Sequence, residues 1–416
     1  MKHIIIGNGP AGLLAAETLR RLQPEAEIAL IGDEHEPPYS RMAIPYFLQG
    51  NIPESGTHLR KVHDHYVQQK IHLIQGRVTK LDAAAKQVEF TDGERLPYDR
   101  LLIASGSQPV RPPVPGIDLP GVETCWTIAD ARAIAAKAQP GSRVLQLGAG
   151  FIGCIIMEAL AARGVKLTVV EMGDRMVPRM MTVKAGGMIK RWVEHKGVSV
   201  HVNAAVTAIV AKDGALSATL GNGSTIAADL VICAAGVKPA TGFLADSGIA
   251  MEQGIRVDAA MRTNLPDVFA AGDVTAAPGF HSGQPQITAI QPNAADQARV
   301  AAYNMAGLDA ASQGSLAINV LDTLGLISTS FGQWSGVATN AGGVGVELVD
   351  EENYRYLSLQ FAHDVLIGAT SIGWTDHVGA LRGLIQTQAK LGVWRERLLA
   401  DPTIFMAAYL ATAQKA

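Results

Sequence analysis

Three glycines near the N-terminus, spaced Gly-x-Gly-x-x-Gly, are the first residues whose types and spacing could do chemistry. Gly7, Gly9 and Gly12 follow the apolar run 3–6, which predicts a buried parallel strand, and open the apolar periodicity of 11–22, which predicts a helix. The first glycine of such a pattern allows a tight turn, the second lets a pyrophosphate approach the backbone, and the third lets the helix pack on the strand. Because a helix N-terminus also favours anions, the pattern predicts a dinucleotide site.

An acidic pair follows at the distance where a ribose hydroxyl needs an acceptor. The second apolar run, 28–31, is followed by Gly32, Asp33 and Glu34, about 20 residues beyond the glycines. A cluster of turn glycines in an ordinary α/β unit is the alternative interpretation of the glycines alone. The strand, helix, second strand and acid in register favour the dinucleotide site.

The same pattern returns in the middle of the chain. Gly148, Gly150 and Gly153 follow an apolar run and precede a predicted helix. The next predicted strand ends at Glu171, eighteen residues past Gly153. The segments 99–109 and 229–239 also repeat one form: Asp, an apolar strand, two small residues with glycine, then proline. Small residues there suit close passage of a backbone beside a cofactor, so the sequence predicts two dinucleotide sites.

Composition excludes several classes of protein. The chain has 416 residues, 48% hydrophobic and 18% charged, which is typical of a folded α/β protein and not of a disordered one. A formal net charge of −3 provides no bulk attraction to nucleic acid or anionic membrane. The sequence predicts no signal peptide and no uncharged run of membrane-spanning length.

The cysteines predict no redox or metal chemistry. Cys125, Cys154 and Cys233 form no C-x-x-C or C-x4-C pair, and each lies in an apolar stretch, which is typical of small buried side chains. No disulfide framework is implied, as expected of a protein in a reducing cytosol, and a cytoplasmic location is predicted. No metal site is predicted.

Several further elements and a domain division can be predicted. A helix is expected to start at Pro292 and another, over 393–413, to break at Pro402. Single strands are expected over 198–209 and 315–330. We expect an α/β fold with two Rossmann-like dinucleotide-binding domains and a C-terminal α+β domain; the expected boundaries are 1–112 and 243–314 for the first domain, 113–242 for the second, and 315–416 for the C-terminal interface domain.

This order of motifs resembles the two-dinucleotide-binding-domain flavoproteins, or pyridine nucleotide–disulfide oxidoreductases. Within that class the chain resembles the rubredoxin and ferredoxin reductases and the flavin module of nitrite reductases. The resemblance implies that the first glycine motif binds FAD and the second binds NADH or NADPH. Glu171 suits the 2′-hydroxyl of NADH, whereas Arg175, four residues later, keeps NADPH open as the alternative.

The resemblance also assigns residues to the cofactors. Asp33 or Glu34 would bind the adenosine ribose, Arg41 would lie near the flavin phosphates or ring, and Asp273 would accept from a ribityl hydroxyl. The helix at Pro292 would direct its positive end at the flavin, where negative charge develops on reduction. The residues expected at the two cofactors are Gly7, Gly9, Pro10, Ala11, Gly12, Asp33, Glu34, Arg41, Val78, Ala104, Ser105, Gly106, Gly148, Gly150, Phe151, Ile152, Gly153, Glu171, Gly236, Gly272, Asp273 and Ile290.

The chain departs from the family where the chemistry takes place. The disulfide reductases carry a C-x4-C pair and the NADH oxidases a single cysteine near position 42, and neither is present here. Close relatives also carry a Lys and a Glu beside the flavin, and here Pro45 or Tyr46 and Ile155 stand at those positions. We expect Tyr46 and Ile155 to form a less polar pocket in place of an ion pair. Neutral drift at an unused site is the alternative.

The expected reaction is hydride transfer from NADH to FAD, followed by electron transfer to an external acceptor. Because no redox cysteine is present, a ferredoxin or rubredoxin is the expected partner. A quinone, oxygen or another small acceptor is the alternative, as in an NADH oxidase or quinone reductase, and so is a role as the flavin subunit through which electrons enter a larger reductase complex. Relatives are often dimers through the C-terminal domain, so a homodimer is also expected. His281, in the loop between Asp273 and Pro292, is either a group near the flavin or a surface histidine.

Overall fold

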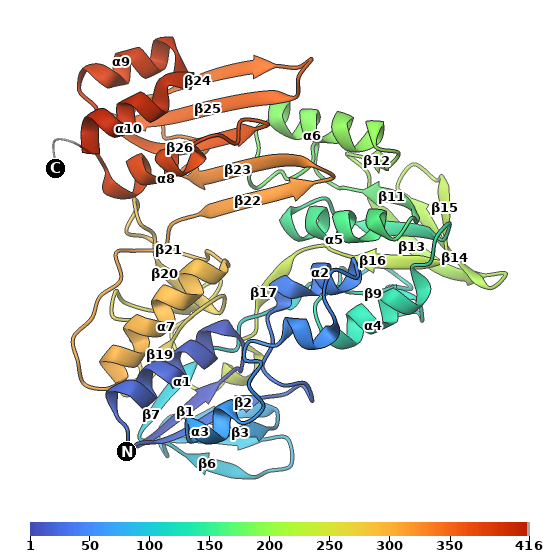
Figure 1. The fold of residues 1–416 in the computed structure, drawn as a ribbon. Coiled ribbons are helices and arrows are strands. Elements are labelled where there is room, and N and C mark those ends of the chain that lie inside the picture. The colour runs from blue at the N-terminus through green and yellow to red at the C-terminus, as the bar shows by residue number, and fades with distance from the viewer. Residues whose placement is uncertain (414–416) are drawn as a thin grey trace. The chain divides into compact units, whose positions relative to one another are not determined.

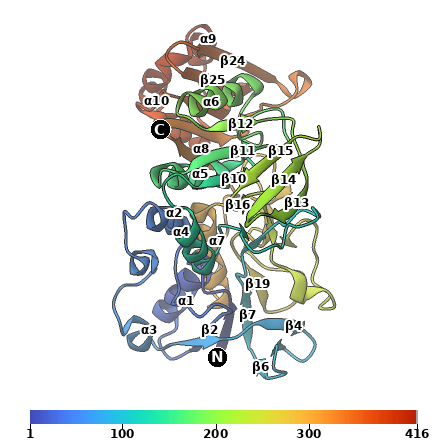
Figure 2. The same ribbon diagram turned by 90° about the vertical axis from the view of Figure 1, so that its right-hand side faces the viewer.

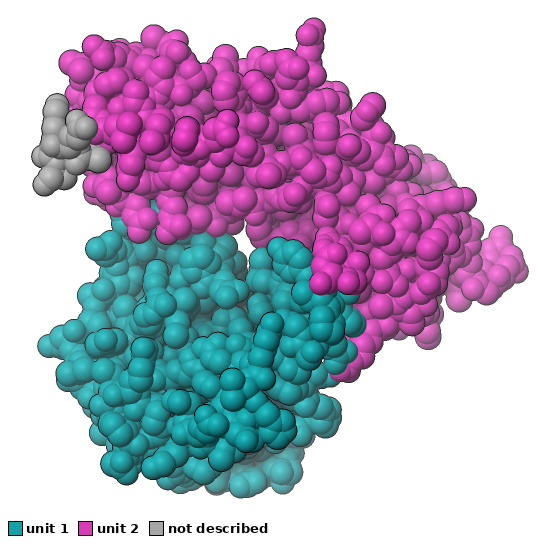
Figure 3. Space-filling view, in the orientation of Figure 1, with its two compact units in different colours: residues 1–47, 52–108, 237–316 teal, residues 48–51, 109–236, 317–416 magenta. Residues whose placement is uncertain are grey.

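The chain divides into two units in its computed structural model, which describes residues 1–413. Unit 1 comprises residues 1–47, 52–108 and 237–316, and unit 2 comprises residues 48–51, 109–236 and the part from 317 onward, as Figure 3 shows in two colours. Two of the passages from one unit to the other are at β8 (Ser107–Pro109) and β17 (Val237–Pro239), which pair with each other.

A five-stranded parallel sheet in the order β19-β7-β1-β2-β3 forms the core of unit 1 (Figure 1). Its strands are short and apolar because helices and loops cover both faces. Helix α1 (Pro10–Leu22) buries Leu13 and Leu19 against this core, and α7 (Gln291–Met305) packs beside it. The strands are β1 (Lys2–Ile6), β2 (Glu27–Gly32), β3 (Ile71–Gln75), β7 (Arg100–Ile103) and β19 (Val268–Ala270).

Smaller elements complete unit 1. An antiparallel sheet contains β4 (Val78–Asp82), β5 (Gln87–Phe90) and β6 (Arg95–Pro97). Another small sheet contains β18 (Ile255–Arg256), β20 (Thr275–Pro278) and β21 (Pro285–Gln286). The short helices are α2 (Ile44–Leu48) and α3 (His65–Gln68), with 3-10 turns at Arg41–Ala43, Glu54–Thr57 and Gly242–Leu244.

Unit 2 repeats the parallel sheet, in the order β12-β11-β10-β16-β9 (Figure 2). The strands are β9 (Val122–Glu123), β10 (Arg143–Leu147), β11 (Lys166–Val170), β12 (Ser199–His201) and β16 (Leu230–Cys233). The helices are α4 (Ile128–Lys137), α5 (Phe151–Ala162) and α6 (Val183–His195). An antiparallel sheet of β13 (Val206–Lys212), β14 (Ala215–Leu220) and β15 (Thr225–Ala228) matches the one in unit 1.

The C-terminal part of unit 2 is an antiparallel sheet with helices packed on it (Figure 1). The strands, in the order β22-β23-β26-β25-β24, are β22 (Ile318–Thr323), β23 (Leu326–Gly332), β24 (Gly343–Asp350), β25 (Arg355–Ala362) and β26 (Val365–Ile372). The helices are α8 (Val378–Thr387), α9 (Val393–Ala400) and α10 (Phe405–Ala413), with 3-10 turns at Thr339–Ala341 and Pro402–Ile404.

Residues of α5, α6 and the α6 N-terminal cap contact this C-terminal sheet. Glu158 of α5 accepts from the backbone N–H of Leu324 at 2.5 Å, and Trp192 of α6 donates from Nε1 to the Leu324 carbonyl at 3.0 Å. The hydroxyl of Tyr356, a fully buried residue, lies 3.0 Å from the Thr182 hydroxyl that caps α6. These contacts explain why the two parts belong to one unit.

Most predicted elements are confirmed, but two predicted strands are wrong and one helix was not predicted. The expected strand 198–209 is divided into β12 and β13 because Asn203 has a φ of 51°. The expected strand 315–330 is a hairpin that turns at Leu324 and Gly325, both with positive φ. Helix α6 was not expected. The break at Pro402 is confirmed, as is the fold class of two Rossmann-like parts and a C-terminal α+β part; the domain boundaries stay predictions, and residues 414–416 of the last domain lie outside the described residues.

Among residues 1–413, no helix combines the length and the apolar character that a membrane crossing needs.

Candidate functional site

The first glycine motif forms the turn between β1 and α1 in unit 1. Gly7 has a φ of +107°, a conformation that only glycine adopts without strain, and its N–H donates to the Ile31 carbonyl at 2.8 Å. A β-carbon on Gly7 would overlap the Ala104 carbonyl oxygen, and one on Gly12 would overlap the Gly7 carbonyl oxygen. These two glycines therefore allow close packing of backbone on backbone.

Gly9 differs from Gly7 and Gly12, the other two glycines of the motif, because the space around it is open. A β-carbon on Gly9 would have no heavy atom within 4 Å, although helix α1 begins at the next residue, Pro10. The first amides of α1 have no carbonyl partner within the helix, so they provide donors and the positive end of the dipole. An open backbone beside free amides is what an approaching pyrophosphate requires, so the turn fits a dinucleotide.

The second motif reproduces this turn in unit 2. Gly148 has a φ of +99°, and its N–H donates to the Val170 carbonyl at 2.8 Å. A β-carbon on Gly153 would lie 2.5 Å from the Gly148 carbonyl oxygen, whereas one on Gly150 would have no heavy atom within 4 Å. The two glycine turns, 7–12 at the start of α1 and 148–153 at the start of α5, therefore have the same geometry. Each is called a cradle below.

Glu171 lies beside the second cradle. Its carboxylate accepts from the N–H of Ala149 and from the N–H of Gly173, both at 2.7 Å. A carboxylate can accept further bonds, so it stays able to bind a hydroxyl group and repels a phosphate. The guanidinium of Arg175 is held by other groups, because it donates to the Met181 carbonyl at 2.8 Å and to Asp174 at 2.6 Å.

Side chains that follow β2 form a cluster in unit 1. Glu34 accepts from the Tyr39 hydroxyl at 2.6 Å and from Arg41 at 2.7 Å, and Arg41 also donates to the Tyr39 oxygen at 3.1 Å. Asp33, by contrast, is exposed. The cluster fixes the guanidinium of Arg41. Tyr39 was not predicted from the sequence, where only the spacing of Glu34, Tyr39 and Arg41 could have indicated it.

Asp273 lies in the turn between β19 and β20, which α7 contacts through Gln297. Burial raises the pKa of Asp273, while the Ser107 hydroxyl at 3.5 Å and the charge of Arg41 oppose the rise. Gln297 of α7, a nearly buried side chain, accepts from the N–H of Gly272 at 2.8 Å and from the Thr275 hydroxyl at 3.0 Å. Gln297 was not predicted from the sequence, because its partners lie over twenty residues away in the chain.

The other predicted residues fall in different surroundings. Ser105 donates to the Ala240 carbonyl at 2.9 Å, and Gly106 and Gly236 both have positive φ with open space around them. Ile290 precedes the first turn of α7, and Phe151 and Ile152 begin α5. The side chains of Val78 and Ala104 lie in the hydrophobic core, and Ala11 is buried in α1.

Tyr46 and Ile155 lie in different units. Tyr46, in α2, is 55% exposed, and Ile155, in α5, is half-buried. Their shared pocket stays a prediction. His281 is half-buried against the Phe280 ring, and its Nε2 has no partner among the described residues; burial lowers its pKa.

All three cysteines are free thiols in poor surroundings for redox chemistry. Burial raises the pKa of Cys125 and Cys154 to about 12, and it also raises the pKa of Cys233. Because the thiolate is the reactive form, none of these thiols is activated.

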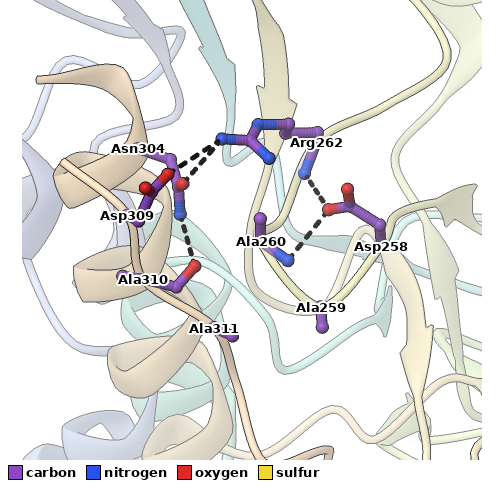
Figure 4. A pocket seen from close by; sticks show the side chains of 8 residues that line it. All are labelled: Asp258, Ala259, Ala260, Arg262, Asn304, Asp309, Ala310 and Ala311. Atoms are coloured by element: carbon purple, nitrogen blue, oxygen red, sulfur yellow. Dashed lines mark hydrogen bonds and ion pairs between the residues drawn. The ribbon is translucent and has the colours of Figure 1, made fainter. Parts of the chain in front are cut away.

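A pocket of about 480 Å³ lies at the far end of α7 from these groups (Figure 4). Arg262 donates to Asn304 at 3.0 Å and lies 4.0 Å from Asp309, while Asp258 accepts from the backbone N–H of Arg262 at 2.8 Å. Asn304 is the fourteenth residue of α7, whereas the Asp273 turn packs near its first turns. Within unit 1 the pocket is therefore separate from the Asp273 turn.

Comparison with known proteins shows which family the chain belongs to. A family model described as pyridine nucleotide-disulphide oxidoreductase matches residues 1–301. The NADH-dependent phenylglyoxylate dehydrogenase subunit epsilon of Aromatoleum evansii is 30% identical over 405 residues, which is 96% of this chain and 95% of that protein. The biphenyl dioxygenase system ferredoxin–NAD(+) reductase component of Paraburkholderia xenovorans is 35% identical over 282 residues, which is 67% of this chain and 69% of that protein.

A solved structure matches the fold of the whole chain. The covalent putidaredoxin reductase–putidaredoxin complex superimposes with a TM-score of 0.89 and 21% identity, and the match covers 99% of each chain. At this identity the match shows the fold alone. The predicted membership is confirmed: the chain belongs to the pyridine nucleotide-disulphide oxidoreductase family, whose members are FAD- and NAD(P)H-dependent oxidoreductases.

Proposed function

We propose that this oxidoreductase takes electrons from NADH and passes them through FAD to a one-electron carrier protein of the ferredoxin or rubredoxin type. The observation that carries the proposal is the pair of cradles, each with an open second glycine, Gly9 and Gly150. Three thiols held protonated by burial argue against a cysteine relay. A relative that is named a ferredoxin–NAD(+) reductase component supports the choice of acceptor.

The chain's own part in this reaction is to bind and orient. Bound FAD would supply the redox chemistry, accepting a hydride from NADH and releasing electrons to the partner. In unit 1 the α1 amides would hold a pyrophosphate, the fixed Arg41 would add a positive charge, and Asp273 would accept a hydroxyl of the cofactor. The first amides of α7 would stabilise negative charge on the ring. In unit 2 the α5 amides and Glu171 would hold NADH.

Anaerobic spectroscopy tests this function. We expect the purified protein to be yellow, and NADH should remove its visible flavin absorption without oxygen. The reduced protein should then be reoxidised much faster by a ferredoxin or rubredoxin than by air or a quinone. Failure of NADH to reduce the flavin would contradict the proposal, and fast reoxidation by air would indicate an oxidase instead.

A second candidate is the flavin subunit of a larger complex. It is favoured by the relative named as a dehydrogenase subunit, which matches 96% of this chain, including the C-terminal sheet. Affinity purification of the tagged chain from its own cells would distinguish the two, because a subunit would bring stoichiometric partners with it. A cytoplasmic location and a homodimer stay predictions.

Coenzyme preference should follow Glu171 and not Arg175. We expect Glu171→Ala with Met172→Arg to change the preference from NADH to NADPH by at least about 100-fold in the ratio of kcat/KM. The change frees the N–H groups of Ala149 and Gly173 for a phosphate, and residue 172, which is 75% exposed, supplies a cation. Stopped-flow reduction with each coenzyme measures the ratio. Arg175→Ala should leave the preference for NADH unchanged; a change there would contradict this assignment.

Asp273 should lower the free energy of unfolding of the apoprotein, while it helps to bind FAD. Because its folded pKa is raised, the folded state binds more protons than the unfolded state, so its contribution to stability falls as the pH rises above about 4. We expect Asp273→Asn to make the apoprotein more stable at pH 7, with little change near pH 3, and to weaken FAD binding about tenfold or more. Urea unfolding against pH and FAD titration measure the two effects. An apoprotein that Asp273→Asn destabilises at pH 7 would contradict this account.

A further inference from the structure

The two cradles of this chain can be compared residue by residue. Gly9 has φ and ψ of −74° and −172°, and Gly150 has −74° and −171°. The paired strands also correspond, since Ile6 is opposite Ile31 and Leu147 is opposite Val170. Each unit therefore serves as a template for the other.

By this correspondence the residue of unit 1 that is equivalent to Glu171 is Gly32, and not an acidic residue. Ile31 and Val170 accept from the first glycine of their motifs, and the next residues are Gly32 and Glu171. The count of residues from the glycines had favoured Asp33 or Glu34. Asp33 is exposed, and the carboxylate of Glu34 is held by the cluster with Tyr39 and Arg41.

Asn8 fills the space that Gly32 leaves open. A β-carbon on Gly32 would overlap Nδ2 and Cγ of Asn8 and would lie 2.9 Å from its Oδ1. The counterpart of Asn8 in the second motif is Ala149, which has only a methyl group. Unit 2 therefore has a small residue within the motif, Ala149, and a long acidic residue after the strand, Glu171. Unit 1 instead has a longer polar residue within the motif, Asn8, and a glycine after the strand, Gly32.

We propose that the carboxamide of Asn8 hydrogen-bonds the adenosine ribose of FAD, as Glu171 would hydrogen-bond that of NADH in unit 2. The carboxamide has both a donor and an acceptor for the two ribose hydroxyls. Asn8 is thus a cofactor-binding residue, and Glu34 acts at a distance by positioning Arg41. This inference rests on the proposed function, which places FAD in unit 1.

Titration of the apoprotein with FAD, followed by flavin fluorescence, tests the assignment. We expect Asn8→Ala to weaken binding about tenfold, as the loss of a hydrogen bond predicts, and Asp33→Ala to leave it unchanged. An FAD analogue with 2′-deoxyadenosine should bind the unaltered protein more weakly than FAD does. Asn8→Ala should bind FAD and the analogue equally. Continued discrimination by Asn8→Ala, or unaltered FAD affinity, would overturn the proposal.

A transplanted arrangement provides the second test. Gly32→Glu alone should lose FAD because its side chain meets Asn8, and the added Asn8→Ala should restore binding by at least about tenfold, since it copies the Ala149 and Glu171 arrangement. Circular dichroism of each apoprotein checks that it folds. No recovery in a folded double variant would overturn the proposal. Absence of FAD binding by the unaltered protein would instead contradict the proposed function.

Discussion

NADH should reduce the flavin of a Gly150→Val protein far more slowly than that of the unaltered protein, although the variant still binds FAD and is still yellow. A β-carbon at Gly150 has no heavy atom within 4 Å, so the side chain of a valine there begins in open space. Its methyl groups would occupy the space through which a pyrophosphate approaches the amides of α5. We expect the second-order rate of flavin reduction to fall by at least about 100-fold, which corresponds to roughly 3 kcal/mol.

Gly9→Val is the matched control, because the same change is made in the other cradle. It should give a folded, colourless protein that does not bind FAD but still binds NADH, as measured by coenzyme fluorescence. Equal loss of flavin in both variants would contradict the assignment of one cofactor to each unit. Unimpaired reduction of Gly150→Val would show that the second cradle is not the NADH site.

The two cradles could be predicted from sequence because all their requirements are local. Gly7, Gly9 and Gly12 each meet a steric demand of one turn, and the alternation of apolar strand and helix marks that turn without any distant contact. The repeat at 143–171 strengthened the prediction, since the same order of strand, glycine motif, helix, second strand and acidic residue occurs a second time. Glu171 could be placed for the same reason: its strand is next to the glycine turn.

The remaining site residues depend on contacts that the linear pattern does not encode. Gln297 meets the Gly272 turn only because α7 packs on the parallel sheet. Counting residues placed an acid near the first cradle but could not separate Gly32 from Asp33, since only the pairing of β1 with β2 fixes the register. Likewise, Asn203 and Leu324 divide apolar stretches by adopting positive φ. Asparagine adopts such a φ more often than most residues, so its type could have indicated the first break, whereas leucine could not have indicated the second.

Gly12→Ala should destabilise unit 1, because the added methyl group meets backbone atoms. Its β-carbon would overlap the Gly7 carbonyl oxygen and lie 3.2 Å from Cγ2 of Ile5, so α1 must move away from β1. Because a backbone atom cannot rotate aside as a side chain can, we expect the free energy of unfolding to fall by about 3 kcal/mol or more. For a unit of this size that lowers Tm by roughly 6 °C or more.

The distribution of tryptophan makes this result specific to unit 1. All five tryptophans lie in unit 2, so their fluorescence reports on that unit, whereas FAD release reports on unit 1. We expect Gly12→Ala to lower the temperature of FAD release far more than that of the tryptophan transition. Gly9→Ala, whose methyl group meets no atom within 4 Å, should leave apoprotein unfolding unchanged. Equal Tm values for the Gly12→Ala and Gly9→Ala apoproteins would contradict the argument that the third glycine is required by packing and the second by the ligand.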